Sequence, residues 1–158
     1  MPEFLIERTS PARPEAAALI ARHVALMAAQ SPEESCHVLD GGGLDTPDVA
    51  FFLIRDGGVP VGMGALRTLP DGAMELKSMH TLAEARGTGA GRAMLEFLLD
   101  HARAQGARGV YLETGSTEDF RPARTLYERY GFVECGPFDD YAEDPWSTFM
   151  HLDLRTAA

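Results

Sequence analysis

The chain has 158 residues, of which 45% are hydrophobic, and its formal net charge at pH 7 is −10. This length and composition predict one packed domain spanning residues 1–158. The acidic charge, with Lys77 as the only lysine, argues against nucleic acid as a partner. No apolar run is long enough to cross a membrane and no segment resembles a signal peptide, so we expect a cytoplasmic protein without a membrane partner.

The cysteines and histidines lack the spacing of a metal site. Cys36 and Cys135 are far apart in sequence, and the five histidines include no pair at positions i and i+4. Bound metals and disulfide frameworks need such clusters. We therefore expect two buried free thiols and no catalytic metal.

The first third of the chain predicts a strand, a helix and a loop. Phe4 begins a short apolar run that is typical of a strand, and residues 13–29 carry apolar side chains at helical spacing. Residues 31–47 are polar and include three consecutive glycines. This segment predicts a long loop or a broken helix of the kind that often borders a binding site.

The middle of the chain predicts three antiparallel strands and then a helix. Residues 49–55, 60–69 and 73–82 are strand-like, and Asp56-Gly57-Gly58 between the first two is a hairpin turn. A glycine-rich turn follows. After it, residues 88–105 carry one apolar face and end at a glycine, which predicts a helix.

The last third completes a mixed α/β sheet. Residues 110–112 are a short apolar run reached through a helix, so this strand should lie parallel to the strand before that helix. Residues 121–130 predict a second helix, and residues 132–135 and 147–154 predict two more strands.

The glycine-rich turn is the strongest functional signal. Gly87, Gly89 and Gly91 leave backbone N–H groups uncovered where a helix begins, and Arg86 and Arg92 flank them. Such a turn is suited to phosphate. A nucleotide-hydrolysing loop needs Lys and Ser or Thr after its glycines, and a dinucleotide fingerprint needs a third glycine where Arg92 stands. Tight packing of the helix on the strand is the plain structural alternative.

The pattern Arg86-x-x-Gly89-x-Gly91 resembles the pyrophosphate loop of the GCN5-related N-acetyltransferases. Glu75-Leu76-Lys77-Ser78-Met79-His80-Thr81 resembles that family's fourth strand, and Ala123-x-x-Leu126-Tyr127-x-x-x-Gly131-Phe132 resembles a segment of its later helix and strand. The segments 112–116, 135–141 and 144–147 are similar to a bacterial subgroup, some of whose members carry an indoleacetate acetyltransferase label. The resemblance covers residues 49–132, and the first strand and helix also fit.

The resemblance implies an α/β fold of the GNAT type: a mixed, mostly antiparallel central sheet flanked by helices, with a splayed pair of parallel strands. It implies acetyl-CoA as co-substrate, no metal, and direct acyl transfer to a small acceptor, for which we expect an amine. The cofactor-binding residues it implies are Met79, His80, Thr81, Arg86, Gly87, Thr88, Gly89, Ala90, Gly91 and Arg92, of which residues 79–81 contribute backbone groups.

For catalysis, the resemblance implies Tyr127 as the acid that protonates the departing thiolate, and Glu75 as a general base. Tyr127 also falls on the apolar face of its helix, and Glu75 shares a strand face with Lys77, so packing and an ion pair are the structural alternatives. His80 and Glu113 are lesser candidates for the base. Tyr130 is expected to pack only.

Several expectations stay open at this level. Arg121 and Arg124 could add to the cofactor site, although the asparagine common there in the family is not found. Candidates for contacts with the acceptor are Glu33, Ser35 and His37, and the acidic segment 139–144, which is more typical of a solvated loop. Trp146 could cover a substrate but is expected in the core. The alternatives are a CoA-binding regulatory module and an acyltransferase for a non-amine acceptor. Related folds often pair through sheet edges, so a homodimer is an open expectation.

Overall fold

The structure is a computed structural model that describes residues 3–32 and 39–155. Its elements follow one another along the chain as β1 (Phe4–Arg8), α1 (Pro14–Gln30), α2 (Gly41–Leu44), β2 (Val49–Asp56), β3 (Val59–Thr68), β4 (Met74–Thr81), the 3-10 turn η2 (Ala83–Ala85), α3 (Ala90–Ala104), β5 (Gly109–Gly115), the 3-10 turn η3 (Glu118–Phe120), α4 (Arg121–Arg129), β6 (Val133–Cys135) and β7 (Ser147–Asp153).

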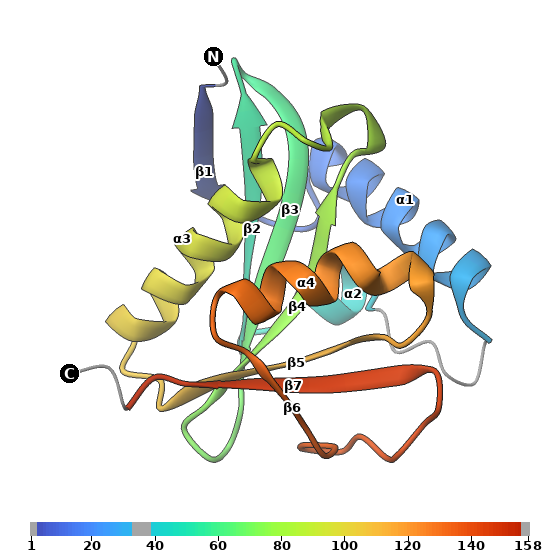
Figure 1. Cartoon of the computed structure of the whole chain (residues 1–158). Helices are drawn as coiled ribbons and strands as arrows, with labels where there is room; N and C mark the ends of the chain where they lie inside the picture. Colours follow the sequence, from blue (N-terminus) through green and yellow to red (C-terminus); the bar gives the residue numbers. More distant parts are fainter. Residues whose placement is uncertain (1–2, 33–38, 156–158) are drawn as a thin grey trace.

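The described strands form one seven-stranded sheet in the order β1-β2-β3-β4-β5-β7-β6 (Figure 1). Within it, β4 and β5 run parallel, and each other neighbouring pair is antiparallel. The predicted fold class, a mostly antiparallel mixed sheet with one parallel pair, is confirmed. In the described part of the chain, no helix has the length and apolar character needed to cross a membrane.

Helices cover both faces of the sheet, and β2 shows why. Phe51 and Leu53 belong to the apolar cluster that contains residues of α1 and α2, whereas Phe52 and Ile54 belong to the cluster that contains residues of α3 and α4. Successive side chains of a strand point to opposite faces, so a strand buried on both sides is apolar throughout. This part of the sheet therefore lies between two helical layers, with α1 on one face and α3 on the other (Figure 1).

A β-bulge interrupts β4 at Ser78. The register passes from Ala65↔Lys77 to Met63↔His80, so β4 contains one more residue than β3 between these two pairs. Ser78 takes up the extra residue with a left-handed φ of 56°, a conformation that costs a non-glycine residue about 1–2 kcal/mol. Bulges of this kind bend a strand and re-aim its side chains, and they concentrate near functional sites.

β4 and β5 separate toward their C-terminal ends, where the bulge lies. Their pairing ends at Leu76↔Leu112, whereas β5 continues beside β7 as far as Gly115↔Ser147. Figure 1 shows β4 continuing beside β3 while β5 turns away with β7, and α4 lies across the angle between them. The predicted splayed pair is therefore present: the bulge bends β4, while β5 stays paired along its other edge with β7.

Some predicted elements differ in detail. The strand expected at residues 110–112 is Gly109–Gly115, because pairing with β7 extends it through polar residues that carry no apolar signal. In the expected loop 31–47, α2 forms where the Asp40 carboxylate accepts a hydrogen bond from Gly43 N at 2.8 Å. Cys135 is a free thiol but only partly buried, so its expected burial is wrong. Cys36 lies outside the described residues.

Candidate active site

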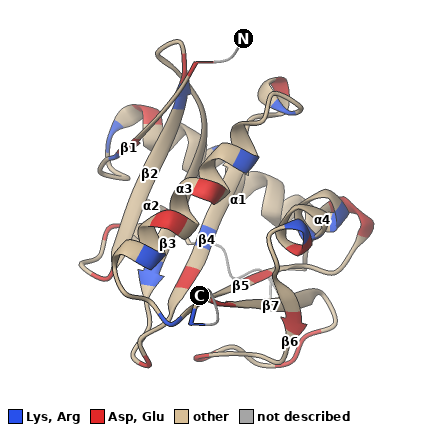
Figure 2. Cartoon of the chain, turned by 60° about the vertical axis from the view of Figure 1, so that its left-hand side comes forward, with Lys and Arg blue, Asp and Glu red and all other residues tan. Residues whose placement is uncertain are grey.

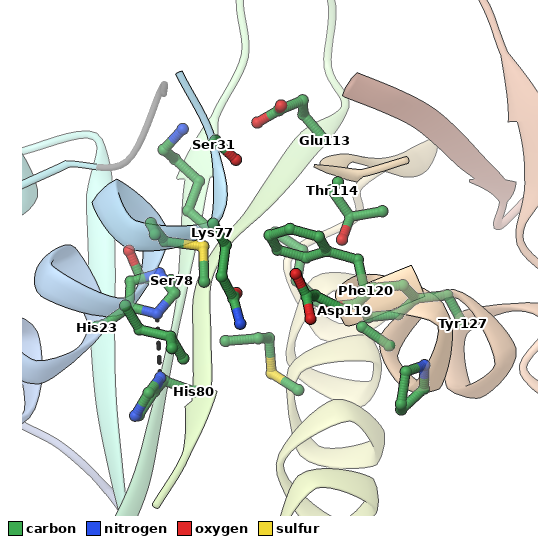
Figure 3. Close-up of a pocket in the computed structure, with 18 of the residues that line it drawn as sticks. His23, Ser31, Lys77, Ser78, His80, Glu113, Thr114, Asp119, Phe120 and Tyr127 are labelled. Atoms are coloured by element: carbon green, nitrogen blue, oxygen red, sulfur yellow. Dashed lines mark hydrogen bonds between the residues drawn. The ribbon is translucent and has the colours of Figure 1, made fainter. Parts of the chain in front are cut away.

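A cavity of about 340 Å³ opens where β4 and β5 separate (Figure 3). Its walls come from α1, the bulged half of β4, the turn before α3, the end of β5, and α4. Cavities of this volume bury small ligands. The predicted site residues that line it are Glu75, Met79, His80, Thr81, Arg86, Gly91 and Tyr127. The other predicted residues, Gly87, Thr88, Gly89, Ala90 and Arg92, adjoin it in the turn and at the start of α3.

The start of α3 presents a row of backbone N–H groups without acceptors. Gly89 caps the helix with a left-handed φ of 94°, and no side chain caps it. Ala93 N donates to the Gly89 carbonyl at 2.9 Å, but the N–H groups of Gly87 and of residues 89–92 meet no acceptor among the described residues. Free N–H groups at a helix start, reinforced by the helix dipole, bind anions such as phosphate.

Two arginines flank this row. Arg86 lines the cavity, Arg92 lies in the first turn of α3, and both side chains are exposed. Figure 2 shows basic residues on either side of the point where α3 begins. Neither arginine forms an ion pair with a described residue, in contrast to Arg55 and Arg67, which pair with carboxylates. Arg86 and Arg92 are therefore available to an anionic ligand.

Arg121 and Arg124 have structural partners. Arg124 Nη1 donates to the carbonyls of Gly115 at 2.7 Å and Thr117 at 2.9 Å, which ties α4 to the end of β5. Arg121 Nη1 lies 3.7 Å from a carboxylate oxygen of Glu118. The structure thus gives Arg124 a role in holding the cavity wall.

Tyr127 reaches the cavity from α4, opposite α1 (Figure 3). Its side chain is buried, and burial raises the pKa of its hydroxyl above the ordinary value. No described residue bonds that hydroxyl. Tyr130, on the same helix end, packs at the edge of the core and donates its hydroxyl to Glu96, so the expectation that it packs only is incomplete.

The Glu75 carboxylate is 1% exposed and accepts four hydrogen bonds. Arg67 donates from Nε at 3.0 Å and Nη2 at 2.8 Å, Lys77 from Nζ at 3.1 Å, and Tyr141 from its hydroxyl at 2.6 Å. The ion pair with Lys77, considered from strand alternation, is confirmed. A carboxylate offers about four acceptor positions, so these donors occupy Glu75 fully. Accepting a proton would require one of them to leave.

A histidine pair lies on the α1 side of the cavity, and the sequence analysis missed half of it. His23 Nδ1 of α1 lies 3.1 Å from His80 Nδ1 of β4, with the rings edge to face (Figure 3). Burial, and then the nearby His80, lower the pKa of His23 to about 4. Burial and the positive charges of Arg86 and Arg22 lower the pKa of His80. The available signal was the place of His23 on the apolar face of α1, three positions after Ile20.

The acidic segment is not simply a solvated loop. Asp139 accepts from Arg67 Nη2 at 2.7 Å and Tyr141 bonds Glu75, so this segment is held over the sheet. Glu113 lines the cavity and accepts from Ser147 Oγ at 2.7 Å. Trp146, expected in the core, is 41% exposed at the cavity rim. Glu33, Ser35 and His37 lie outside the described residues.

Comparison with known proteins identifies the family. The model of the acetyltransferase (GNAT) family matches residues 20–132. YsnE of Bacillus subtilis, described as an uncharacterized N-acetyltransferase, is 40% identical over 86% of this chain and 90% of its own length. A protein of Azospirillum brasilense named IAA acetyltransferase is 39% identical over 98% of this chain and its full length, 100%. A crystal structure from Klebsiella pneumoniae, of a protein assigned as an acyl-CoA N-acyltransferase, is 31% identical with a TM-score of 0.77, covering 96% and 97% of the two chains.

Proposed function

Because the chain belongs to the acetyltransferase (GNAT) family and is an acyltransferase enzyme, we propose that it moves an acetyl group from acetyl-CoA directly to the nitrogen of a small amine. The observation that carries the proposal is the row of free N–H groups at the start of α3, beside a cavity that continues to Tyr127 on one side and to the histidine pair on the other.

The donor's phosphates would lie at the start of α3. The free N–H groups of Gly87 and residues 89–92 supply hydrogen bonds, and the positive end of the helix dipole adds to them. Arg86 and Arg92 supply charge without first giving up a carboxylate partner. These groups match the negative charge and the hydrogen-bond acceptors of a pyrophosphate.

The thioester would lie against the bulge of β4. The β3–β4 ladder skips Ser78 and Met79, so these residues have no register partner on β3. A backbone N–H beside this break in the ladder, within residues 79–81, can then donate to the thioester oxygen, where negative charge develops during the attack. The left-handed Ser78 is the backbone feature that turns the strand for this purpose.

Tyr127 would protonate the departing thiolate. Burial raises the pKa of its hydroxyl, which keeps the proton in place at neutral pH. The same burial makes a thiolate beside it a stronger base, so the thiolate can take the proton; the negative charge passes to the Tyr127 oxygen until a proton from water restores the hydroxyl. The assignment of Glu75 as base stays a prediction, and its four hydrogen bonds suit it equally to positioning Lys77 and Tyr141.

The acceptor would enter from the α1 side. One similar protein is named IAA acetyltransferase, and the aromatic side chains Tyr141 and Trp146 are among those that line the cavity. An acceptor panel should therefore contain aliphatic amines, polyamines, amino acids, aromatic amines and aromatic acids. Aromatic acids also test the alternative of a non-amine acceptor.

Two measurements test the proposal. Acetyl-CoA at a hundred times its Kd should add about 2.7 kcal/mol of stability, and an unchanged Tm would refute the donor. Free thiol released from acetyl-CoA, measured against the panel, should rise with at least one acceptor. Stabilisation by acetyl-CoA without thiol release on any acceptor would favour the CoA-binding module instead.

A matched pair of tyrosine variants tests the acid. Tyr127→Phe should lower kcat by roughly 100-fold or more, the usual contribution of a positioned acid, with the stabilisation by acetyl-CoA retained. Tyr130→Phe removes a hydroxyl from the same helix end outside the cavity and should leave kcat unchanged. Equal rates in the two variants would remove Tyr127 from the mechanism.

A further inference from the structure

The buried ring of His23 and the half-buried ring of His80 share one hydrogen bond between their Nδ1 atoms, which fixes how many protons the two rings hold. His23 Nδ1 and His80 Nδ1 are 3.1 Å apart, so one nitrogen carries the hydrogen and the other accepts it. When both rings are neutral, the ring that donates has an unprotonated Nε2, and the ring that accepts has a protonated Nε2. The neutral pair therefore always holds one free Nε2 lone pair.

The pair can take up one proton without losing its hydrogen bond. A proton added to the free Nε2 leaves the Nδ1–H···Nδ1 bond in place, now as a charge-assisted bond, which is the stronger kind. A second proton would put hydrogens on both Nδ1 atoms and break the contact. The two rings thus act as a unit that accepts one proton, and their apparent pKa values belong to the pair.

The charges around the pair keep it neutral until a proton is delivered. On α1, Arg22 neighbours it and is itself paired with Glu84 at 3.2 Å, and the turn before α3 adds Arg86. The strand neighbour Lys77 is occupied by Glu75. No carboxylate among the described residues bonds either ring, so no anion holds the pair in its protonated form at neutral pH.

The position of the pair suits a base that works opposite the acid. His23 comes from α1 and His80 from β4, and both line the cavity on the side away from Tyr127 (Figure 3). No described residue bonds either Nε2. Glu75, the carboxylate on the same strand face, has its acceptor positions filled by Arg67, Lys77 and Tyr141.

We infer that the hydrogen-bonded His23–His80 pair is the base that takes the proton from the acceptor nitrogen, an inference that rests on the proposed function. As the acceptor nitrogen bonds the acetyl carbon, its N–H bond breaks and the proton moves to the free Nε2. The carbon–sulfur bond breaks, and the thiolate takes the proton of Tyr127. The pair then releases one proton to water and Tyr127 regains one, so the cycle balances without a further reagent.

A nuclear magnetic resonance titration tests the pair without turnover. In the full chain labelled with 15N at histidine, saturated with CoA, the two Nδ1 atoms at pH 7 should show one shared proton, and one Nε2 should be unprotonated. On acidification the two rings should gain their first proton as a coupled pair. Two rings that titrate independently, or two protonated Nδ1 atoms at pH 7, would overturn the inference.

Kinetics test the role in transfer. His23→Asn and His80→Asn keep an amide near the Nδ1 position and remove Nε2. Each should lower kcat/KM for the best acceptor of the panel by about 100-fold or more with the stabilisation by acetyl-CoA unchanged, and the double variant should lose little more than either single one, as expected of residues that act together. His101→Asn, on α3 against Phe52 and Phe97, is the matched control and should keep full activity.

The pH dependence separates the pair from Glu75 and from the acceptor. The ratio of wild-type to His80→Asn kcat/KM cancels the titration of the acceptor itself, and it should fall on acidification, with a midpoint below pH 6.5. Glu75→Gln should leave the midpoint of the wild-type acidic limb in place. A ratio that does not vary with pH, or kcat/KM values of the histidine variants within threefold of wild type, would refute the role of the pair as base. Neither result would contradict the proposed acetyltransferase function. Absence of both turnover and acetyl-CoA stabilisation in the wild type would refute the proposed function first.

Discussion

His23 should make the stability of the fold depend on pH in a window that its burial defines. The side chain is 7% exposed, and its desolvation, followed by the proximity of His80, lowers its pKa from 6.5 to about 4. At pH 5 the unfolded chain therefore binds a proton at this position that the folded chain does not bind. Acidification favours the state that binds more protons, so it favours unfolding.

The magnitude follows from the two pKa values. Lowering the pKa of His23 from 6.5 to about 4 corresponds to about 3 kcal/mol, at ~1.4 kcal/mol for each pH unit. This contribution to the free energy of unfolding is complete above pH 6.5. It is lost progressively as the pH falls from 6.5 to about 4, and below that no more is lost through this residue.

Urea unfolding of the wild type and of His23→Asn at several pH values between 7.5 and 4 measures the effect. The substitution lowers stability at neutral pH, but the informative quantity is the slope against pH, since the carboxylates and the histidines outside the pair contribute equally to both proteins. The wild type should lose about 3 kcal/mol more than the variant over this window. His101→Asn, at a less buried ring, should change the slope less. Parallel curves for wild type and His23→Asn would show that His23 is not held neutral by the fold.

Three further substitutions test the geometry of the site. Gly89→Ala forces a left-handed φ of 94° on a residue with a side chain, so it should lower the free energy of unfolding by about 1–2 kcal/mol and weaken acetyl-CoA binding. The control Gly57→Ala, with φ 57° in the β2–β3 hairpin, should lower stability alone. Equal acetyl-CoA affinities of the two variants in calorimetry would contradict the anion site. Glu75→Ala leaves Arg67 and Lys77 without their buried carboxylate and should lower the free energy of unfolding in urea by about 3–5 kcal/mol. A loss below about 1 kcal/mol would mean that these ion pairs contribute little to stability. Gly115→Ala places a methyl group 2.0 Å from the ring of Phe120 and should cost about 1–3 kcal/mol by displacing that ring from the cavity wall, visible as a lower Tm.

Local features of the sequence predicted the donor half of the site. Gly87 and Gly89 form the turn with φ of 81° and 94°. Glycine adopts such angles because it has no side chain, so the residue type alone predicts the turn. The place of Tyr127 on an apolar helix face follows from helical spacing, and it is buried as that spacing predicts. The parallel β4–β5 pair follows from a strand–helix–strand order. Each of these depends on neighbours within a few positions along the chain.

The acceptor half depended on the tertiary structure. His23 and His80 are 57 positions apart in the sequence, and Glu75 and Tyr141 are 66 positions apart. No local sequence pattern therefore predicts either contact. The bulge at Ser78 decides which side chains of β4 face α1, because one extra residue reverses the alternation of the strand. By itself, the sequence determined the elements, their order and the turn that suits a phosphate, since backbone preferences and periodicity act over a few residues. Only the packed structure decided which titratable groups share the cavity and which are already occupied, since that depends on side chains brought together by the burial of two faces of one sheet.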